Sequence, residues 1–151
     1  MITDYLCAVS WRARPRSFVS LMTLYESNYI RLGWLVDDPR RLADRAVSEV
    51  RDDCPLELSV LERAPYTTTV TLSYLFDESG ATIRDPGLGL RIYHDARLTE
   101  VTSVGQPHAG LRHVHSRLRR SADGRWSVNV LLNKWLEYCA ERGHRFAPAA
   151  G

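Results

Sequence analysis

Disulfide chemistry and membrane anchoring are the first features that this sequence lacks. The chain has three cysteines in 151 residues, Cys7, Cys54 and Cys139, and no Cys-x-x-Cys motif. Cysteines so few and so widely spaced are typical of reduced thiols rather than of a disulfide framework. No apolar run approaches the roughly 18 residues of a membrane span, and Met1–Val9 carries an acidic residue where an export signal has a basic one. The sequence therefore predicts a cytoplasmic protein that does not cross a membrane.

The chain also lacks an excess of charge of one sign. Its 20 basic and 18 acidic side chains leave a net charge of +2, which is too small to attract a polyanion to the whole molecule. Lys134 is the single lysine, and the arginines are scattered along the chain, as codon bias in a GC-rich genome would produce. A basic run at 112–125 has no aromatic residue for base stacking except the adjacent Trp126, so we interpret it as a solvated loop. Nucleic acid is therefore not expected as a partner.

Motifs of known catalytic machinery are missing too. The chain contains no Gly-rich phosphate loop, no Gly-x-Ser-x-Gly, no His-Glu-x-x-His and no Cys–His pairing. His113 and His115 would share one side of a strand, at a spacing that a metal ion can use. No third and fourth ligand follows with metal-like spacing. We therefore predict no catalytic residues, no metal and no cofactor, while the question of enzymatic activity stays open.

Two helices are predicted at the ends of a single domain. One begins after Ser17 and runs to about Val36, and the other runs from about Trp126 to Arg142, where Gly143 ends it. The second helix is expected to bury Val128, Leu131, Leu132, Trp135, Leu136 and Cys139 and to turn Asn129, Asn133, Glu137 and Glu141 outward. A chain of 151 residues is expected to form one domain, here with irregular tails at 1–14 and 145–151.

Alternating apolar and polar residues predict strands between these helices. The alternating runs are 56–60, 67–76, 88–94 and 97–104, with turns at 77–80 and 85–87 and a last short strand near 111–117. Residues 39–53 fit either a short helix or a first edge strand. Strands that alternate in this way are typical of an antiparallel sheet with one covered face. The predicted fold class is α+β, a single antiparallel sheet of four to five strands flanked by an N-terminal and a C-terminal helix.

A hairpin at 88–104 gathers polar residues that could bind a ligand. If residues 95–96 make a two-residue turn, Arg91 lies opposite Glu100 as an ion pair, on the face that also carries Tyr93. A second polar block lies at the start of the clearest strand and offers hydroxyl groups to a phosphate or a carboxylate. The candidate ligand-binding residues are Tyr66, Thr67, Thr68, Arg91, Tyr93, His94, Asp95 and Glu100.

Structural roles explain the same residues without a ligand. Threonine is a good strand residue, and Tyr66 can bury its ring with its hydroxyl at the rim. Neighbours on a strand point to opposite faces, so His94 and Asp95 meet as an acid–base pair only if the turn begins at His94. Otherwise Asp95 bonds backbone groups, and His94 is half-exposed at the end of the hairpin.

Four stretches of the chain follow one another as they do in a known family. They are Leu21–Tyr29, Tyr66-Thr67-Thr68, Leu90–Ala96 with Glu100-Val101, and Asn129 with Trp135–Cys139 and Gly143. Together they resemble the YqiB-like proteins, a proteobacterial family of unknown function. Between Gly105 and Arg125 the chain departs from the family's pattern, with Ser121–Arg125 in place of an acidic Asp-Glu-Lys step. The resemblance implies a compact cytosolic bacterial protein and no particular activity.

Two classes of function are compatible with this sequence. We favour a small binding or interaction module without catalytic activity, using an exposed sheet face or a helix edge, because no nucleophile or metal-ligand set is recognisable. The alternative is a small enzyme or a sensor for a phosphorylated or carboxylated metabolite, with Arg91, Tyr93, His94 and Glu100 at the ligand. The partner stays unidentified, and a homodimer is one option.

Overall fold

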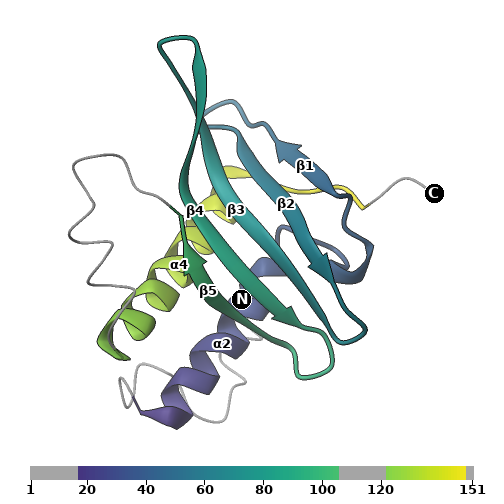
Figure 1. Ribbon diagram of the computed structural model, residues 1–151, viewed down its shortest axis with the longest axis vertical. Helices are drawn as coiled ribbons and strands as arrows, with labels where there is room; N and C mark the ends of the chain where they lie inside the picture. Colours follow the sequence, from purple (N-terminus) through teal and green to yellow (C-terminus); the bar gives the residue numbers. More distant parts are fainter. Residues whose placement is uncertain (1–16, 106–121, 149–151) are drawn as a thin grey trace.

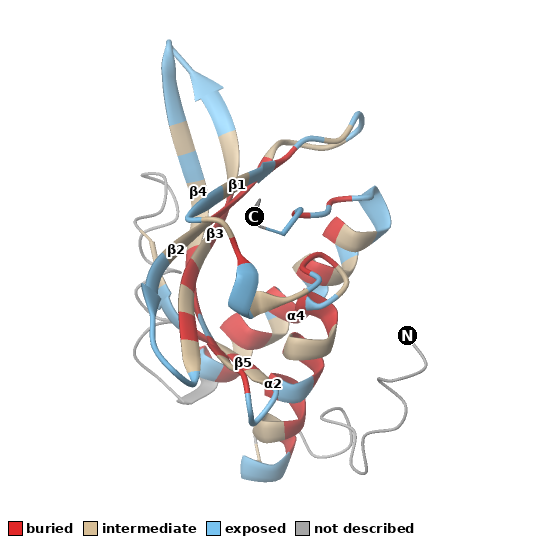
Figure 2. Ribbon diagram, turned by 90° about the vertical axis from the view of Figure 1, so that its right-hand side faces the viewer, coloured by how far each residue is buried: buried red, intermediate tan, exposed pale blue. Residues whose placement is uncertain are grey.

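The computed structural model describes residues 17–105 and 122–148, which form an α+β fold. Five strands make one antiparallel sheet in the order β1-β2-β3-β4-β5. An N-terminal helix, α2, and a C-terminal helix, α4, cover one face of the sheet; among the residues that the structure describes, no helix covers the other face, which we call the helix-free face (Figures 1 and 2). The predicted fold class is thereby confirmed. Within the described ranges, no helix is long and apolar enough to cross a membrane.

The strands follow one another as hairpins, each beside its neighbour in sequence. Their bounds are Arg45–Ser48 for β1, Leu56–Arg63 for β2, Thr67–Glu78 for β3, Ala81–Tyr93 for β4 and Leu98–Val104 for β5. The ambiguous stretch at 39–53 contains a 3-10 helix, Pro39–Arg41, and then β1 as an edge strand. Sequential antiparallel pairing is the expected topology when the connections are this short.

The predicted turn at 85–87 is wrong, because these residues form a bulge within β4. The β3–β4 ladder is regular up to the pair of Leu72 and Leu88, and it resumes at Tyr74 after a shift of register. Gly87 fits this irregular stretch with a φ of +63°, a conformation that residues with a Cβ rarely adopt. β4 therefore continues through the bulge and exceeds its predicted span.

The predicted turn at 77–80 is present, and it closes a projecting arm. Ser79 and Gly80 have φ values of 51° and 82°, as a two-residue hairpin turn of type I′ requires. Residues 75–78 pair with 81–84 beyond the last residues that pair with β2 and β5 (Figure 1). The arm is thus a two-stranded ribbon at one end of the five-stranded sheet.

The sequence located one end of each helix correctly, the start of α2 and the end of α4. α2 spans Phe18–Leu32, and its N-cap Ser17 accepts the Ser20 N–H through Oγ at 3.1 Å. It ends at Gly33 rather than near Val36. α4 spans Ala122–Arg142 and is followed by Gly143 at a φ of 95°, the left-handed conformation that ends many helices.

The hydrophobic core lies between the sheet and these helices. The strands contribute Leu56, Leu58, Val70, Leu72, Leu88, Leu90, Ile92 and Val101, and the helices contribute Leu32, Val128, Leu132, Leu136 and Cys139. Buried positions accordingly face the space between the two layers (Figure 2). Phe146, after α4, also joins the core and forms an isolated parallel bridge with Val36. The segment that follows α4 is therefore packed into the domain at this residue.

Two asparagines close the free edge of β5. Asn28 of α2 donates from Nδ2 to the Thr99 carbonyl at 3.3 Å, and Asn129 of α4 accepts the Val101 N–H at Oδ1 at 3.0 Å. Asn28 Nδ2 also lies 3.3 Å from Asn129 Oδ1. A primary amide offers the same donor and acceptor as a peptide group. The pair therefore bonds two backbone groups of β5 as a neighbouring strand would, and it covers part of an edge that could otherwise pair with another chain.

The prediction that the asparagines of α4 face outward is wrong. Asn129 and Asn133 are fully buried, whereas Leu131 is 48% exposed. Asn133 donates from Nδ2 to Ser27 Oγ at 2.9 Å and to Asn28 Oδ1 at 3.1 Å. The interface between α2 and α4 thus has a polar stripe, which an apolar periodicity cannot reveal.

Candidate functional site

The candidate residues lie in three different places. Thr67, Arg91, Tyr93 and Glu100 are on the helix-free face of the sheet, Tyr66 and Asp95 are in exposed turns, and Thr68 and His94 are buried on the helix-covered face. Alternate residues of a strand point to opposite faces, so the sheet divides each polar block of the sequence. The residues that remain together form one cluster, at the hairpin end of the helix-free face.

The predicted register of the β4–β5 hairpin is confirmed, but its predicted ion pair is absent. Arg91 lies opposite Glu100, and Tyr93 lies opposite Leu98. Glu100 Oε1 accepts a hydrogen bond from Tyr93 Oη at 2.6 Å. No carboxylate among the described residues lies within ion-pair distance of Arg91. Tyr93 lies diagonally across from Glu100 and donates a hydrogen bond to its carboxylate. The exposed guanidinium of Arg91 stays hydrated at little cost, because an exposed ion pair is weak.

Tyr25 of α2 completes this cluster at the edge of the sheet. Burial and the neighbouring charge of Glu100 raise the pKa of Tyr25 to about 12. The hydrogen bond to Glu100, together with burial, also raises the pKa of Tyr93, although the guanidinium of Arg91 opposes this effect. Both hydroxyls therefore stay protonated at neutral pH and can donate hydrogen bonds. Arg91 is the exposed member of the cluster, whereas Glu100 is half-buried.

His94 belongs to the other side of the sheet and is not half-exposed as predicted. Its side chain is buried, and Nε2 lies 2.8 Å from Thr68 Oγ1. Burial, and then the charge of Arg40, lower the pKa of His94, so the imidazole is neutral at pH 7. Asp95 forms an exposed ion pair with Arg40 at 3.1 Å. Tyr93, His94 and Asp95 therefore do not combine into one acid–base site.

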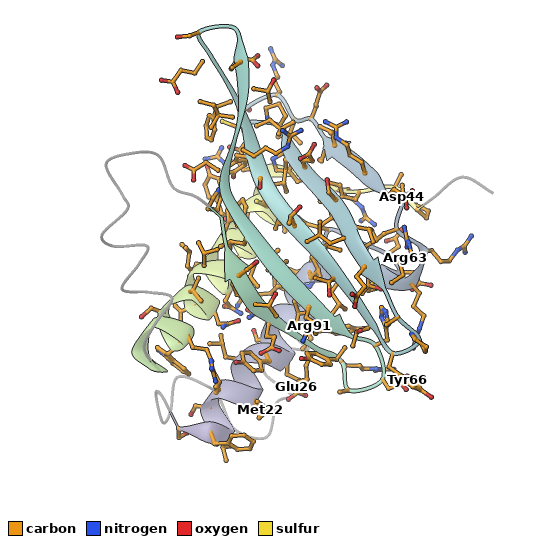
Figure 3. All side chains as sticks on the ribbon, viewed as in Figure 1. Met22, Glu26, Asp44, Arg63, Tyr66 and Arg91 are labelled. Carbon is orange, nitrogen blue, oxygen red and sulfur yellow. The ribbon has the colours of Figure 1, made fainter. Side chains whose placement is uncertain are left out.

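Tyr66 lies in the β2–β3 turn, beside the β4–β5 turn. Its carbonyl accepts the His94 N–H at 2.9 Å, which joins the two turns at the same end of the sheet. The expectation of a buried ring is wrong, because Tyr66 is 68% exposed. Figure 3 shows Tyr66 beyond the strand ends and Arg91 on the sheet nearby. The ring is therefore free to contact a ligand that reaches the cluster around Arg91.

Sequence reasoning missed a buried polar network at the arm end of the sheet. His144, just after α4, has Nε2 3.0 Å from Asp53 Oδ2 and Nδ1 2.8 Å from Ser48 Oγ. Tyr74 of β3 donates from Oη to the same Asp53 oxygen at 2.7 Å. These residues come from four separate segments. The sequence held only one signal for them, a histidine directly after the glycine that ends the last helix.

The order Ser48, His144, Asp53 is that of a Ser-His-Asp relay, but the surroundings indicate a structural role. Burial alone would raise the pKa of Asp53, yet hydrogen bonds from Tyr74, a backbone amide and His144 hold that pKa below its usual value. Asp53 therefore stays charged and can only accept, so His144 donates to it from Nε2. Ser48 is 5% exposed, and its Oγ also accepts the Arg145 N–H at 3.1 Å. The hydroxyl is occupied and screened from any substrate.

Cys139 lies beside this network, and we expect its burial to make the protein less stable at alkaline pH. The thiol is fully buried, and burial raises its pKa from 9.0 to about 11. The thiol of the unfolded chain releases its proton at a lower pH than the thiol of the folded chain. The free energy of unfolding is therefore expected to fall by on the order of 2 kcal/mol as the pH rises from about 9 to about 11. Urea unfolding at about pH 8 and about pH 10.5 measures this loss.

Two cysteine variants test that assignment. Cys139→Ala is expected to lose this part of the alkaline dependence, whereas Cys54→Ala, at a half-buried thiol, is expected to keep it. The same dependence in wild type and Cys139→Ala would contradict the prediction.

The metal and basic-run hypotheses fall largely on undescribed residues. The residues that lie outside the described ranges are His113, His115, the strand placed near 111–117 and most of the basic run. Within 17–105 and 122–148, no three His, Cys, Asp or Glu side chains are grouped so that they could hold a metal ion. The expected absence of a metal site therefore stays a prediction.

The fold and these residues define a class, a small α+β protein with a five-stranded meander that carries its described helices on one face. The model of the family described as "Protein of unknown function (DUF1249)" matches residues 31–145, and the chain belongs to this family. It is 30% identical over 138 residues to the uncharacterized protein YqiB of Escherichia coli strain K12 and of E. coli O157:H7, and the alignment covers 87% of this chain and 94% of each relative. The resemblance to YqiB-like proteins is thereby confirmed. No solved structure matches the chain.

Proposed function

We propose that this protein is a non-catalytic binding module that holds a phosphorylated or carboxylated ligand at the hairpin end of its helix-free sheet face. Arg91 supplies the charge, Tyr93 and Thr67 supply hydroxyl groups, and Tyr66 supplies an exposed ring. The observation that carries the proposal is the state of Arg91. Glu100 lies directly opposite, yet it accepts a hydrogen bond from Tyr93, and no carboxylate of the described part of the chain pairs with the guanidinium. An exposed guanidinium fork in that state is suited to an oxyanion.

Support for binding rather than catalysis comes from the location of the one histidine in the hairpin. His94 lies behind the sheet, bonded to Thr68, so it cannot exchange a proton with a ligand held by Arg91. Tyr25 and Tyr93, with their raised pKa values, serve as hydrogen-bond donors and are poor bases at neutral pH. A cytoplasmic location remains part of the proposal, because the free thiols of Cys54 and Cys139 suit a reducing compartment.

A thermal-shift screen with phosphorylated and carboxylated metabolites tests the proposal. A ligand present at about 100 times its Kd is expected to stabilise the protein by about 2.7 kcal/mol and to raise its Tm by about 5–10 °C. Arg91→Ala is expected to abolish this rise and to leave the Tm of the free protein within about 2 °C, because no ion pair is lost.

Arg51→Ala is the matched control, since Arg51 is an exposed arginine in the β1–β2 connection. It should bind the ligand as the wild type does. A ligand-induced rise that survives in Arg91→Ala would exclude the proposed site, and a panel without any hit would count against this ligand class.

A further inference from the structure

The helix-free face carries a second charged cluster, near the arm, around Glu57 of β2. The Glu57 side chain is 3% exposed, although no described helix covers this face, whereas Arg45 and Arg84 on either side are 56% and 52% exposed. The hydrogen bond from Arg84 outweighs burial and, with a further one from Arg45, holds the pKa of Glu57 below its usual value. Glu57 is therefore ionised, and solvent meets two cations and almost none of the anion between them.

One carboxylate orients both guanidinium groups. Arg84 donates to Glu57 from Nε at 2.6 Å and from Nη2 at 3.3 Å, and Arg45 donates from Nε at 2.5 Å. The two arginines share one carboxylate oxygen, Oε2. Arg84 reaches Glu57 across β3, where the residue opposite Glu57 is the small Ser73. A guanidinium has five N–H donors, so most donors of each arginine are not used by Glu57.

From this geometry we propose that Arg45 and Arg84 form a binding site for a phosphoryl group, either on a small molecule or as free phosphate. The trio has one negative and two positive charges, so an incoming anion relieves the repulsion between the two guanidinium groups. One guanidinium fork is enough for the two oxygens of a carboxylate, whereas a tetrahedral phosphate has the further oxygens that a second fork requires. The site thus favours phosphate over carboxylate.

This site is separate from the proposed ligand site at Arg91 on the same face. On β3, Arg84 is paired with Leu75 and Arg91 is paired with Thr69. Six residues along a strand correspond to about 20 Å. A single phosphate therefore cannot contact both arginines, and the two sites can be tested independently.

Titration of the 151-residue chain with inorganic phosphate, followed through the NMR signals of the arginine Nε–H groups, tests the proposal. The signals of Arg45 and Arg84 are expected to shift saturably at millimolar phosphate, and acetate is expected to bind about tenfold more weakly. Arg84→Lys keeps the charge but removes the fork, so it should weaken phosphate binding about tenfold. Arg51→Lys, at an exposed position outside the trio, should leave the affinity unchanged.

Several outcomes would overturn this inference. They are an Arg45 or Arg84 signal that does not shift with phosphate up to about 50 mM, an equal response to acetate, and an unchanged affinity in Arg84→Lys. The unfolding curve of each variant shows whether it is folded, which separates lost binding from lost structure. Arg91→Ala should leave this titration unaltered, so failure of one site can be distinguished from failure of the other.

Discussion

Replacing Asn129 with alanine is expected to lower the free energy of unfolding by about 3–5 kcal/mol. The side chain is fully buried, accepts the Val101 N–H at 3.0 Å and donates to the Arg125 carbonyl at 2.9 Å. Alanine leaves the buried Val101 N–H without an acceptor and opens a cavity between α4 and β5. Denaturant unfolding followed by circular dichroism measures the change.

Lys134→Ala is the control for this substitution, since it changes an exposed residue of the same helix. Its effect should stay within about 0.5 kcal/mol. Asn129→Ala should also increase association at high protein concentration, because it uncovers the edge of β5. If Asn129→Ala were as stable as Lys134→Ala, Asn129 would not be closing that edge.

His144→Ala is expected to cost about 3 kcal/mol of stability. The imidazole is almost fully buried, and its removal takes one partner from Asp53 and one from Ser48. The charged carboxylate of Asp53 then loses one of its three donors, in a site that is mostly shielded from water. The loss is measured by urea unfolding at neutral pH. Arg145→Ala is the control, because its ion pair with Asp37 is exposed and should contribute no more than about 1 kcal/mol.

The same network makes stability sensitive to acid. The pKa of Asp53 is lower in the folded chain than its ordinary value, so its stabilising effect is present above about pH 4 and is lost as the pH falls further. Asp53→Asn removes the titrating group and should flatten this part of the pH dependence. Two results together would show that the network contributes little. They are equal stability of His144→Ala and Arg145→Ala, and an unchanged loss of stability at acid pH in Asp53→Asn.

Local patterns in the sequence predicted the frame of the sheet well. Alternation along the strands set the antiparallel class, and it placed Arg91 opposite Glu100 in the register that the structure has. Turn composition located Ser79 and Gly80 correctly. These features depend on neighbours within a few residues, which is the range that periodicity and turn chemistry report.

What the sequence could not predict depends on distant segments. Asn129 is polar and falls off the apolar stripe of its helix, yet its partner Asn28 comes from 101 positions earlier in the chain. His94 looked like a hairpin end, but it is buried, and its neighbours include Arg40 from a segment 54 positions earlier in the chain. Glu57 alternates like a solvent-facing strand residue, and its burial comes from Arg45 and Arg84 on other strands. Burial of a polar side chain is decided by such tertiary partners, which no local window contains.

The covering of the β5 edge by the final helix has a consequence for synthesis on the ribosome. Protein chains emerge N-terminus first, so all five strands leave the ribosome before Asn129 of α4 and Phe146 can join them. Until then α2, with its Asn28, is the described helix available to cover the sheet, so part of the apolar side and the Val101 N–H on the β5 edge stay exposed. An exposed edge is a surface through which separate molecules join their sheets. Folding is therefore completed only after α4 and Phe146 have emerged, and a chain that stops before α4 leaves an aggregation-prone intermediate for chaperones or proteases to remove.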